Sequence, residues 1–426
     1  MSNVDSKPFF KRPAYWFASS YSFCYYACAA FVFSFYAIWL SSEIGLSAEQ
    51  TGILYSSNFT FSLFFMSFYG ILQDKLVLKK HLVWFQSIIM TCCAPAIIYV
   101  YEPLLRESFY VGVVFGSVYL GLGWVAGMGL VDSFCDKISR ACSIEFGQVR
   151  TWGSLSYAAG TFIAGLLMSV DPHLNFYMAS AVGVLYMVLN IVFKPENISA
   201  ENMAKIANNN QSLTFAEIIS VFKLVRFWIF VLYVLGTYSL YNIFDQQLFP
   251  VFFTHLFDEK SNAYQIYGYL NSAQVFLEAA VMFTVPFVAN KIGAKNALIF
   301  AAFVSFLRIY LASVVTSVEM FAVIKLMHCL EISTVLVAVF KYIQCNFDKR
   351  LSATVFLIGY QVAGSIGVIA FSSTVGSFYD SYGAGVTFHY LGLTVLAFMI
   401  FAVIFLKQDK SFKQIFKKDK LTTSAA

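Results

Sequence analysis

Three ionisable side chains lie inside one long apolar segment of this sequence. The segment 320–340 contains Lys325, His328 and Glu331, each three residues from the next. A charge at the centre of a bilayer costs about 2.5–3.5 kcal/mol on insertion scales. Such groups therefore persist only where they pair, face water or take part in function. On a helix this spacing confines them to one face about 120° wide, since residues three apart differ by about 60° in direction.

Glu331 is the residue of this set that is best suited to carry a proton. Its neighbours Leu330 and Ile332 are apolar, and a dry environment favours the neutral form of a carboxyl group. Arg308, in the preceding apolar segment, could approach Glu331 and drive the proton off. A purely structural ion pair is the alternative for His328 and Glu331.

Asp132 and Arg150 form a second polar set that could hold a sugar. A carboxylate and a guanidinium fork bind neighbouring hydroxyl groups through charge-assisted, bidentate hydrogen bonds. Trp152 and Tyr157 follow Arg150 and offer flat faces for the apolar side of a pyranose ring. Packing is the commoner role of an aromatic side chain in a sequence that is 19% aromatic.

A third polar stripe lies in the segment 263–289. Asn271, Gln274 and Glu278 are three and four residues apart, which places them on one face of an otherwise apolar helix. Lining of a cavity is a better explanation for this stripe than exposure to lipid. Asp245, on the segment before it, is expected to form a structural charge pair with Lys325.

The composition is that of a membrane protein. Of the 426 residues 59% are hydrophobic and only 12% are charged, whereas a soluble chain has about 25% charged residues. Segments of the roughly 20 residues needed to cross a bilayer recur along the whole sequence. We predict helical spans, because backbone polar groups in lipid need internal partners, at 15–41, 47–72, 81–101, 108–134, 151–170, 174–193, 225–252, 263–289, 295–313, 318–340, 352–376 and 385–407.

Basic residues are sorted between alternate loops. One set of loops carries Lys75, Lys79, Lys80, Lys137, Arg140, Lys194, Lys223, Lys291, Lys295, Lys341, Lys349 and Arg350. The other set carries only Arg106 and Lys260. Because basic loops mark the cytoplasmic side, we expect both termini to be cytoplasmic in a multi-pass protein of a bacterial inner membrane. The sorting also argues against a nucleic-acid partner for the net charge of +5.

Other classes of function find no support in the sequence. The eight cysteines have no metal-ligand spacing, and we expect no metal or other cofactor, with the proton as the coupling ion. The motifs GxSxG, HExxH and GxxxxGK[ST] do not occur. An intramembrane enzyme is therefore disfavoured, and an ATP-driven pump built from this chain alone is excluded.

An internal repeat divides the chain into two halves. The loop after the second predicted span reads G-I-L-Q-D-K-L-V-L-K-K from Gly70, and the loop after the eighth contains Asn290, Lys291, Gly293 and Lys295. Both resemble GxxxDKxGxKK, the loop signature of the major facilitator superfamily, although Val77 replaces a glycine in the first copy. We expect an all-α membrane protein of twelve transmembrane helices, with six-helix bundles at 1–193 and 223–426 and a cytoplasmic linker at 194–222.

Several motifs together resemble the oligosaccharide:proton symporters, the lactose permease group. They are EFGxxR at 145–150, FDQQ at 244–247, FKY at 340–342, Arg308 and the 325/328/331 spacing. The resemblance implies sugar binding by Asp132, Arg150 and Tyr157, and proton coupling by Arg308, His328 and Glu331. It also implies a charge pair between Asp245 and Lys325. Finer stretches, such as NIFDQQLFPVF at 242–252, are similar to the sucrose-transporting branch.

Two departures from the family pattern bear on specificity. Asn242 and Gly364 replace both members of a second charge pair of the family. Removal of only one member would leave an uncompensated buried charge, so replacement of both is expected. Val275 replaces the glutamate of lactose permeases on the eighth helix, which leaves open whether Gln274 or Glu278 takes its place. We include Asn271 and Gln274 in the sugar site and Glu278 in the proton-coupling set.

The function expected from these observations is proton-coupled symport of a disaccharide into the cell by alternating access. Sucrose is the first choice of substrate, with lactose, raffinose or maltose as alternatives. A drug or metabolite exporter of the same superfamily is a further alternative, against which the hydroxyl-binding chemistry of Asp132 and Arg150 argues. We expect the working unit to be a monomer in the lipid bilayer.

Overall fold

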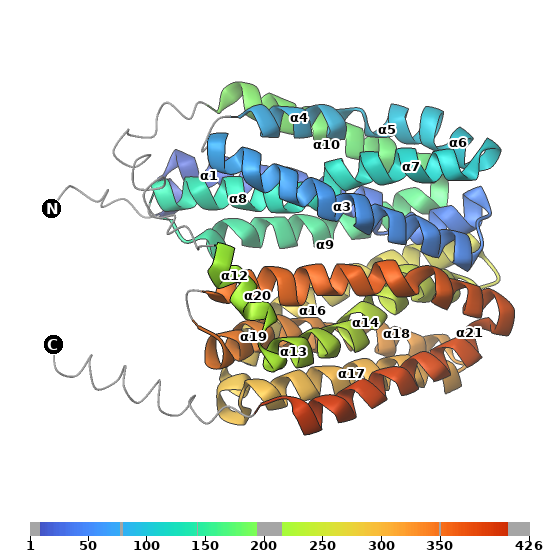
Figure 1. The fold of residues 1–426 in the computed structure, drawn as a ribbon. Coiled ribbons are helices and arrows are strands. Elements are labelled where there is room, and N and C mark those ends of the chain that lie inside the picture. The colour runs from blue at the N-terminus through green and yellow to red at the C-terminus, as the bar shows by residue number, and fades with distance from the viewer. Residues whose placement is uncertain (1–8, 77–79, 143, 194–214, 349–350, 408–426) are drawn as a thin grey trace, which may run out of the picture. The chain divides into compact units, whose positions relative to one another are not determined.

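The structure is a computed structural model that describes residues 9–76, 80–142, 144–193, 215–348 and 351–407 (Figure 1). All regular elements of these residues are helical. Contacts divide the chain into two units, one containing Met1–Gln211 and Pro250–Ala273 and the other Ser212–Phe249 and Gln274–Ala426. We call them unit 1 and unit 2.

Unit 1 holds the spans of the first half of the chain. Its helices are η1 (Phe9–Lys11), α1 (Pro13–Phe33), α2 (Tyr36–Trp39), η2 (Leu40–Ile44), α3 (Ala48–Leu76), α4 (His81–Thr91), α5 (Cys93–Ala96), η3 (Ile97–Tyr101), α6 (Glu102–Glu107), α7 (Phe109–Leu120), η4 (Gly121–Val125), α8 (Ala126–Ala141), α9 (Phe146–Val170) and α10 (His173–Val192), with most of α15 (Phe249–Thr254) and the first part of α16 (Lys260–Ile292). Within it, α1 packs along α9 and α10, and α3 packs along α7 and α8.

Unit 2 holds the remaining described spans. Its helices are α12 (Phe215–Phe222), α13 (Val225–Gly236), α14 (Tyr238–Ile243), η6 (Phe244–Leu248), the second part of α16, α17 (Ala294–Val314), α18 (Val318–Leu326), α19 (His328–Asn346), α20 (Ser352–Phe356), η8 (Leu357–Val362) and α21 (Ala363–Phe405). Here α17 packs against α19 and α21, and α13 and α14 pack against α21. Phe227, Phe230 and Tyr342 belong to its buried apolar cluster.

Each predicted span corresponds to helix in the structure. Nine described helical segments are long and apolar enough to cross a membrane, and the bent pair His81–Thr91 and Cys93–Glu107 makes a tenth. The helix α3 is 29 residues long but carries several Ser, Thr and Asn residues. The last segment breaks at Gly383, where φ is +79°, and so supplies both of the final two predicted spans. A glycine accepts this left-handed conformation without steric cost.

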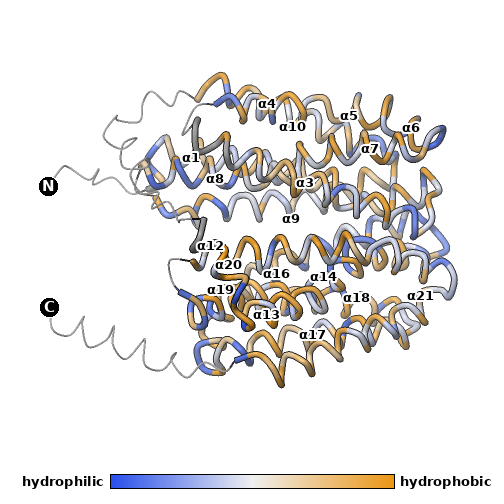
Figure 2. Tube along the Cα trace, in the orientation of Figure 1, coloured by the Kyte–Doolittle hydropathy of each residue, from blue (hydrophilic) through white to orange (hydrophobic). Residues whose placement is uncertain are grey.

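The helices extend beyond the predicted spans at their polar ends. The fifth predicted span begins at residue 151, whereas α9 begins at Phe146, and the tenth ends at 340, whereas α19 continues to Asn346. In Figure 2 the polar residues gather near the helix ends, and hydropathy alone does not detect such turns as helix. Gly293 of the second loop repeat has φ +87°, which explains the glycine, while Val77 of the first copy lies outside the described residues.

The predicted halves divide the chain by sequence position, whereas the two units group residues that contact one another. The segment Pro250–Ala273 belongs to unit 1 by contact although it lies in the second half of the sequence. Its Gly268 packs against Gly165 of α9 so closely that a Cβ on Gly268 would lie 2.8 Å from the Gly165 Cα. Residues 194–214 of the predicted linker lie outside the described part of the chain.

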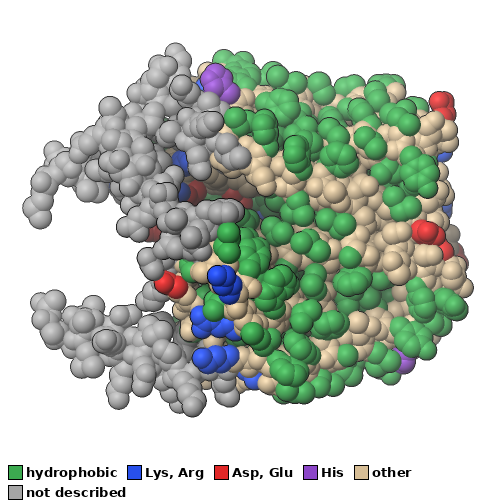
Figure 3. All heavy atoms as spheres, in the orientation of Figure 1, with side chains coloured by type: hydrophobic (Ala, Val, Ile, Leu, Met, Phe, Trp, Pro, Cys, Tyr) green, Lys and Arg blue, Asp and Glu red, His purple; other side chains and the backbone are tan. Residues whose placement is uncertain are grey.

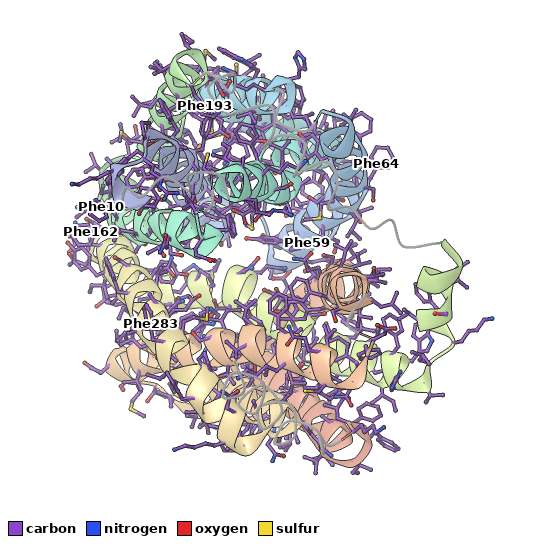
Figure 4. All side chains as sticks on the ribbon, turned by 90° about the vertical axis from the view of Figure 1, so that its left-hand side faces the viewer. Phe10, Phe59, Phe64, Phe162, Phe193 and Phe283 are labelled. Atoms are coloured by element: carbon purple, nitrogen blue, oxygen red, sulfur yellow. The ribbon has the colours of Figure 1, made fainter. Side chains whose placement is uncertain are left out.

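The surfaces of the helices are apolar along their length. Figure 3 shows hydrophobic side chains spread along the helices and charged ones gathered towards the ends. Figure 4 labels exposed phenylalanines on several helices, among them Phe64, Phe162 and Phe283, whose exposed fractions are 69%, 42% and 79%. This is the surface expected of helices that face acyl chains.

Candidate proton-coupling and sugar sites

A buried charged cluster in unit 2 is centred on Arg308 of α17. Its guanidinium is fully buried and places Nη2 2.7 Å from Oδ1 of Asp245. Nη1 contacts the Glu331 carboxylate and lies 3.1 Å from Nδ1 of His328. Because a guanidinium only donates hydrogen bonds, Nδ1 accepts here, and the imidazole has its proton on Nε2. The structure thus brings together three of the four residues predicted to couple protons, Arg308, His328 and Glu331.

Lys325 completes the cluster through Asp245. Its Nζ lies 3.4 Å from Asp245 Oδ2, which is the predicted contact between the two residues. Asp245 is nevertheless closer to Arg308 than to Lys325, so that its carboxylate bridges two cations. The interpretation of Asp245 and Lys325 as a separate structural pair is therefore incomplete, because Asp245 also belongs to the Arg308 cluster.

The local backbone explains how Asp245 and the triad reach the same point. Asp245 lies in the π-turn η6, and such turns often occur at functional sites. The predicted tenth span breaks at Met327, so that Lys325 lies at the end of α18 and His328 begins α19. All three triad residues contact Asp245 or Arg308. Their common face survives the break.

Ser305 is a contact of Glu331 that sequence reasoning missed. Its hydroxyl donates a hydrogen bond to Glu331 Oε1 while Arg308 contacts Oε2. Ser305 precedes Arg308 by three residues on α17, and this spacing places both on one helix face. That spacing was the signal in the sequence that could have identified it. Both oxygens of the buried carboxylate therefore have a donor.

The cluster contains two basic and two acidic side chains, and their charges cancel when all four are ionised. Arg308 and Lys325 can carry two positive charges, and Asp245 and Glu331 two negative ones. Breaking a buried pair by removing one partner is strongly destabilising, since it leaves an uncompensated charge. Protonation of Glu331 changes this balance by one unit, which makes the cluster sensitive to a single proton.

Glu278 and Gln274 lie on α16 in unit 2. Gln274 is buried, and its Nε2 lies 3.4 Å from Oε2 of Glu278. The hydroxyl of Ser333 on α19 donates to the backbone carbonyl of Glu278 over 3.2 Å. These contacts join the polar stripe of α16 to the helix that carries Glu331. Asn271, also buried, lies one turn earlier on α16 within unit 1.

Asp132 and Arg150 come together in unit 1. Arg150 Nε lies 3.5 Å from Asp132 Oδ1, and the side chains of both are 30% exposed. Tyr26 of α1, which sequence reasoning missed, donates to Asp132 Oδ2 over 2.9 Å. The Arg150 guanidinium lies 3.7 Å from the Tyr26 ring centroid, a cation–π contact. Both side chains are thus partly exposed, although Oδ1 of Asp132 is itself buried and accepts no hydrogen bond from the described residues.

Gly153 allows α1 to approach Arg150. A Cβ at Gly153 would lie 2.6 Å from Ser22 Oγ and from Tyr26 Cδ2, and 2.9 Å from Arg150 Nη1. Any side chain at this position would therefore displace the tyrosine or the guanidinium. The glycine of the TWG sequence is thus needed for the geometry of the Asp132–Arg150–Tyr26 set.

The two aromatic candidates of α9 have different surroundings. Trp152 donates from Nε1 to the Tyr15 hydroxyl over 2.9 Å and packs on Trp16 with ring centroids 5.7 Å apart. These contacts favour a packing role for Trp152 over the predicted stacking on a sugar. Tyr157 is half-buried and lies two turns beyond Arg150 on the same face of α9, about 10 Å along the axis.

Asn242 and Gly364, which replace the second charge pair of the family pattern, both have close neighbours in unit 2. Gln246 Nε2 donates to Asn242 Oδ1 over 3.1 Å. A Cβ on Gly364 would lie 2.7 Å from the Tyr238 ring, and the Gly364 carbonyl accepts from Ser239 over 3.0 Å. The space next to Gly364 is thus filled by Tyr238.

Gly364→Ala is expected to destabilise the protein by about 1–3 kcal/mol, the usual cost of overpacking. The added methyl group would press on Tyr238, which packs on Tyr360 with centroids 4.6 Å apart. The thermal unfolding midpoint of the purified protein in detergent would measure the effect. Gly129→Ala is the matched control, since a Cβ there meets no described atom within 4 Å. Equal midpoints for the two variants would contradict the packing argument.

Comparison with known proteins assigns the chain to a family. The family model described as LacY proton/sugar symporter matches residues 7–419. The chain belongs to the LacY proton/sugar symporter family. It is 43% identical to a sucrose permease of Escherichia coli, with 94% of this chain and 95% of the permease covered. It is 34% identical to a raffinose permease of Escherichia coli, with coverage of 95% and 96%.

The symporter also resembles solved transporters in fold. The nucleoside transporter NupG superposes with a TM-score of 0.74 at 15% identity, covering 92% of this chain and 99% of the transporter. The inward-open structure of the xylose transporter XylE from E. coli gives a TM-score of 0.63 at 13% identity, with coverage of 95% and 97%. These likenesses concern the fold alone. The symporter is an all-α membrane protein with many candidate spans and has the fold of these transporters, as predicted.

Membership of this family decides the class of function. The symporter is a multi-pass membrane transporter of sugar and protons and not an enzyme. The predicted family resemblance is thereby confirmed. The roles predicted for individual residues are not tested by these comparisons and stay predictions, although the structure groups them into the Arg308 cluster of unit 2 and the Asp132–Arg150 pair of unit 1.

Proposed function

We propose that this symporter carries sucrose into the cell together with a proton. The observation that carries the coupling half of the proposal is the full burial of Glu331 between Arg308 and Ser305. A carboxyl group in this position can hold a proton only when the charges around it rearrange. The 43% identity to a protein named sucrose permease supports the choice of sugar.

The proton step takes place at Glu331. With Glu331 ionised, Arg308 and Ser305 hold both of its oxygens, and the cluster is balanced in charge. When Arg308 withdraws, the carboxyl group loses its cation in a dry environment and takes up a proton, because the charged form is then disfavoured. Renewed contact with Arg308 releases the proton. Asp245, which also contacts Lys325, keeps Arg308 paired when it leaves Glu331.

The sugar step takes place at Asp132 and Arg150. The carboxylate accepts hydrogen bonds from the sugar hydroxyls, and the guanidinium donates two parallel bonds to their oxygens. The Tyr26 hydroxyl donates a hydrogen bond to Asp132, and the Tyr26 ring makes a cation–π contact with the Arg150 guanidinium. The sequence also favours Tyr157, Asn271 and Gln274 as sugar-binding residues. Glu278, which Gln274 contacts, is a second carboxyl group that can respond to the proton.

Alternating access joins the two steps. In this fold the substrate binds near the bilayer midplane, and the two halves rock around it. The driving force is the membrane potential, worth about 2.3 kcal/mol per charge per 100 mV, together with the pH gradient. No metal or nucleotide takes part. The proposed working unit is a monomer in the bacterial inner membrane. The sorting of basic loops supports a cytoplasmic location of both termini.

Uptake of labelled sugars tests the choice of substrate. Cells that lack their own disaccharide permeases and express this chain are offered sucrose, raffinose, lactose or maltose, with and without a protonophore. We expect accumulation of sucrose above the outside concentration, and its loss when the proton gradient is removed. Raffinose is the second candidate, because a raffinose permease is 34% identical over 95% of the chain. Accumulation of raffinose but not sucrose would replace one sugar by the other.

A further inference from the structure

The starts of the first and seventh spans carry the same tryptophan contact. Trp16 of α1 donates from Nε1 to the carbonyl of Phe10 over 2.8 Å. Trp228 of α13 donates from Nε1 to the carbonyl of Phe222, also over 2.8 Å. Each tryptophan follows its phenylalanine by six residues. The pattern Phe-Lys-x-x-x-aromatic-Trp therefore recurs at the same point of both halves, with the same hydrogen bond.

This contact leaves about half of each indole side chain exposed, while the rest packs on neighbouring aromatic rings. A carbonyl at the end of a helix has no partner within that helix, and the indole N–H supplies one at the end of η1 and of α12. Trp16 is 47% exposed and Trp228 is 49% exposed. In a membrane protein, exposed tryptophan at the end of a span is typical of the headgroup level. Because the N–H is used internally, the exposed part of each ring is apolar.

An exposed cation and an exposed phenylalanine stand beside each indole. Phe10 is 49% exposed and Phe222 is 38% exposed, and the next residues, Lys11 and Lys223, are exposed as well. In Figure 4 Phe10 lies at the outer edge of unit 1. An ammonium group next to apolar rings suits the boundary where phosphates meet acyl chains.

The arginines of the two segments contact the protein instead. Arg12 donates from Nη1 to the carbonyl of Cys142 over 2.8 Å, and Cys142 caps the end of α8. The Arg226 guanidinium lies 5.2 Å from the ring centroid of Phe347, which caps the end of α19. In both halves the arginine thus ties the start of the first span to the end of the fourth, and the lysine faces outward.

We propose that these two segments are docking sites for anionic phospholipid headgroups, one on each half of the symporter. Six spans separate the two starts, and an even number returns the chain to the same side of the membrane, so that both sites meet one leaflet. The basic loops of that side mark it as cytoplasmic, where the leaflet carries anionic lipids. Lysine provides the complementary charge, and Phe and Trp insert at the acyl boundary.

Retention of lipid by the purified full-length protein tests the proposal. Native mass spectrometry would compare the binding of phosphatidylglycerol with that of phosphatidylcholine. Each surface lysine contributes about fivefold in affinity, which corresponds to about 1 kcal/mol. We expect the wild type to prefer phosphatidylglycerol and the double variant Lys11→Gln/Lys223→Gln to lose about fivefold in its affinity per site.

The control variant removes two other exposed lysines. Lys260→Gln/Lys291→Gln changes the same total charge at residues that lie outside the two segments. Phosphatidylglycerol retention should stay at the wild-type level in this control. Unchanged retention in Lys11→Gln/Lys223→Gln, or an equal loss in the control, would overturn the proposal. The more disruptive pair Trp16→Leu/Trp228→Leu should also lower retention of both lipids, and the lysine variants decide the result if this pair does not fold.

Discussion

Glu331→Gln is expected to abolish uphill accumulation of sugar while exchange of sugar across the membrane continues. A glutamine amide keeps the size and polarity of the side chain but cannot take up and release a proton. The wild type should reach a concentration ratio of about 50-fold per 100 mV of membrane potential, from about 2.3 kcal/mol per charge. The variant should equilibrate to a ratio near one. Labelled sugar in energised membrane vesicles measures both quantities.

The control for this result is Glu319→Gln. Glu319 is an exposed carboxylate in the first turn of α18, at the outer end of the same predicted span. Its loss should leave accumulation unchanged. Glu278→Gln extends the series, because Glu278 is the other acidic candidate for proton coupling. Accumulation driven by a pH gradient in Glu331→Gln would exclude Glu331 as the proton carrier.

Arg150→Lys is expected to abolish most of the sugar binding. An ammonium group carries the same charge but cannot reproduce the two parallel hydrogen bonds of a guanidinium or its stacking on Tyr26. A hydrogen bond to a charged group is worth about 1.5–3 kcal/mol, so that the loss of one corresponds to about 10- to 160-fold in affinity. Direct sugar binding to the purified variant, by calorimetry or protection against an alkylating reagent, would measure this loss.

A matched substitution separates this effect from a general loss of positive charge. Arg140→Lys lies near the end of α8, where Arg140 is exposed and pairs with Asp136. An exposed ion pair contributes little to stability, and sugar affinity should not change. Affinity equal to the wild type in Arg150→Lys would remove Arg150 from the sugar site. Correct folding of both variants is checked by their elution and unfolding midpoints.

Tertiary structure was needed to identify the partners of the predicted residues. Ser305 and Tyr26 each donate a hydrogen bond to a predicted carboxylate. Ser305 shares a helix face with Arg308, but nothing in the sequence pairs either residue with its carboxylate. Their roles depend on how neighbouring helices cross and rotate, and the period of a helix fixes only which residues share a face. For the same reason the sequence paired Asp245 with Lys325 and did not predict its closer contact with Arg308.

Packing also decided the use of aromatic residues and glycines. The sequence offered Trp152 as a stacking surface, whereas its ring packs on Trp16 and its N–H binds Tyr15. Gly153, Gly165 and Gly364 have no distinctive pattern around them, and the structure shows that each allows another helix to approach. Such contacts are specific to the pair of helices, so no single segment could predict them.

The sequence by itself determined the twelve membrane spans, their helical nature and the identity of the charged residues at their centres. The physical reason is the bilayer, which excludes charge and unpaired backbone groups so strongly that composition and spacing reveal both the spans and the exceptions. The tertiary structure decided which of these charged residues contact one another. Arg308 is the centre of one cluster, and Arg150 with Asp132 and Tyr26 forms the other, because close approach between helices depends on small residues and local breaks, such as Gly153, Met327 and the π-turn at Phe244–Leu248.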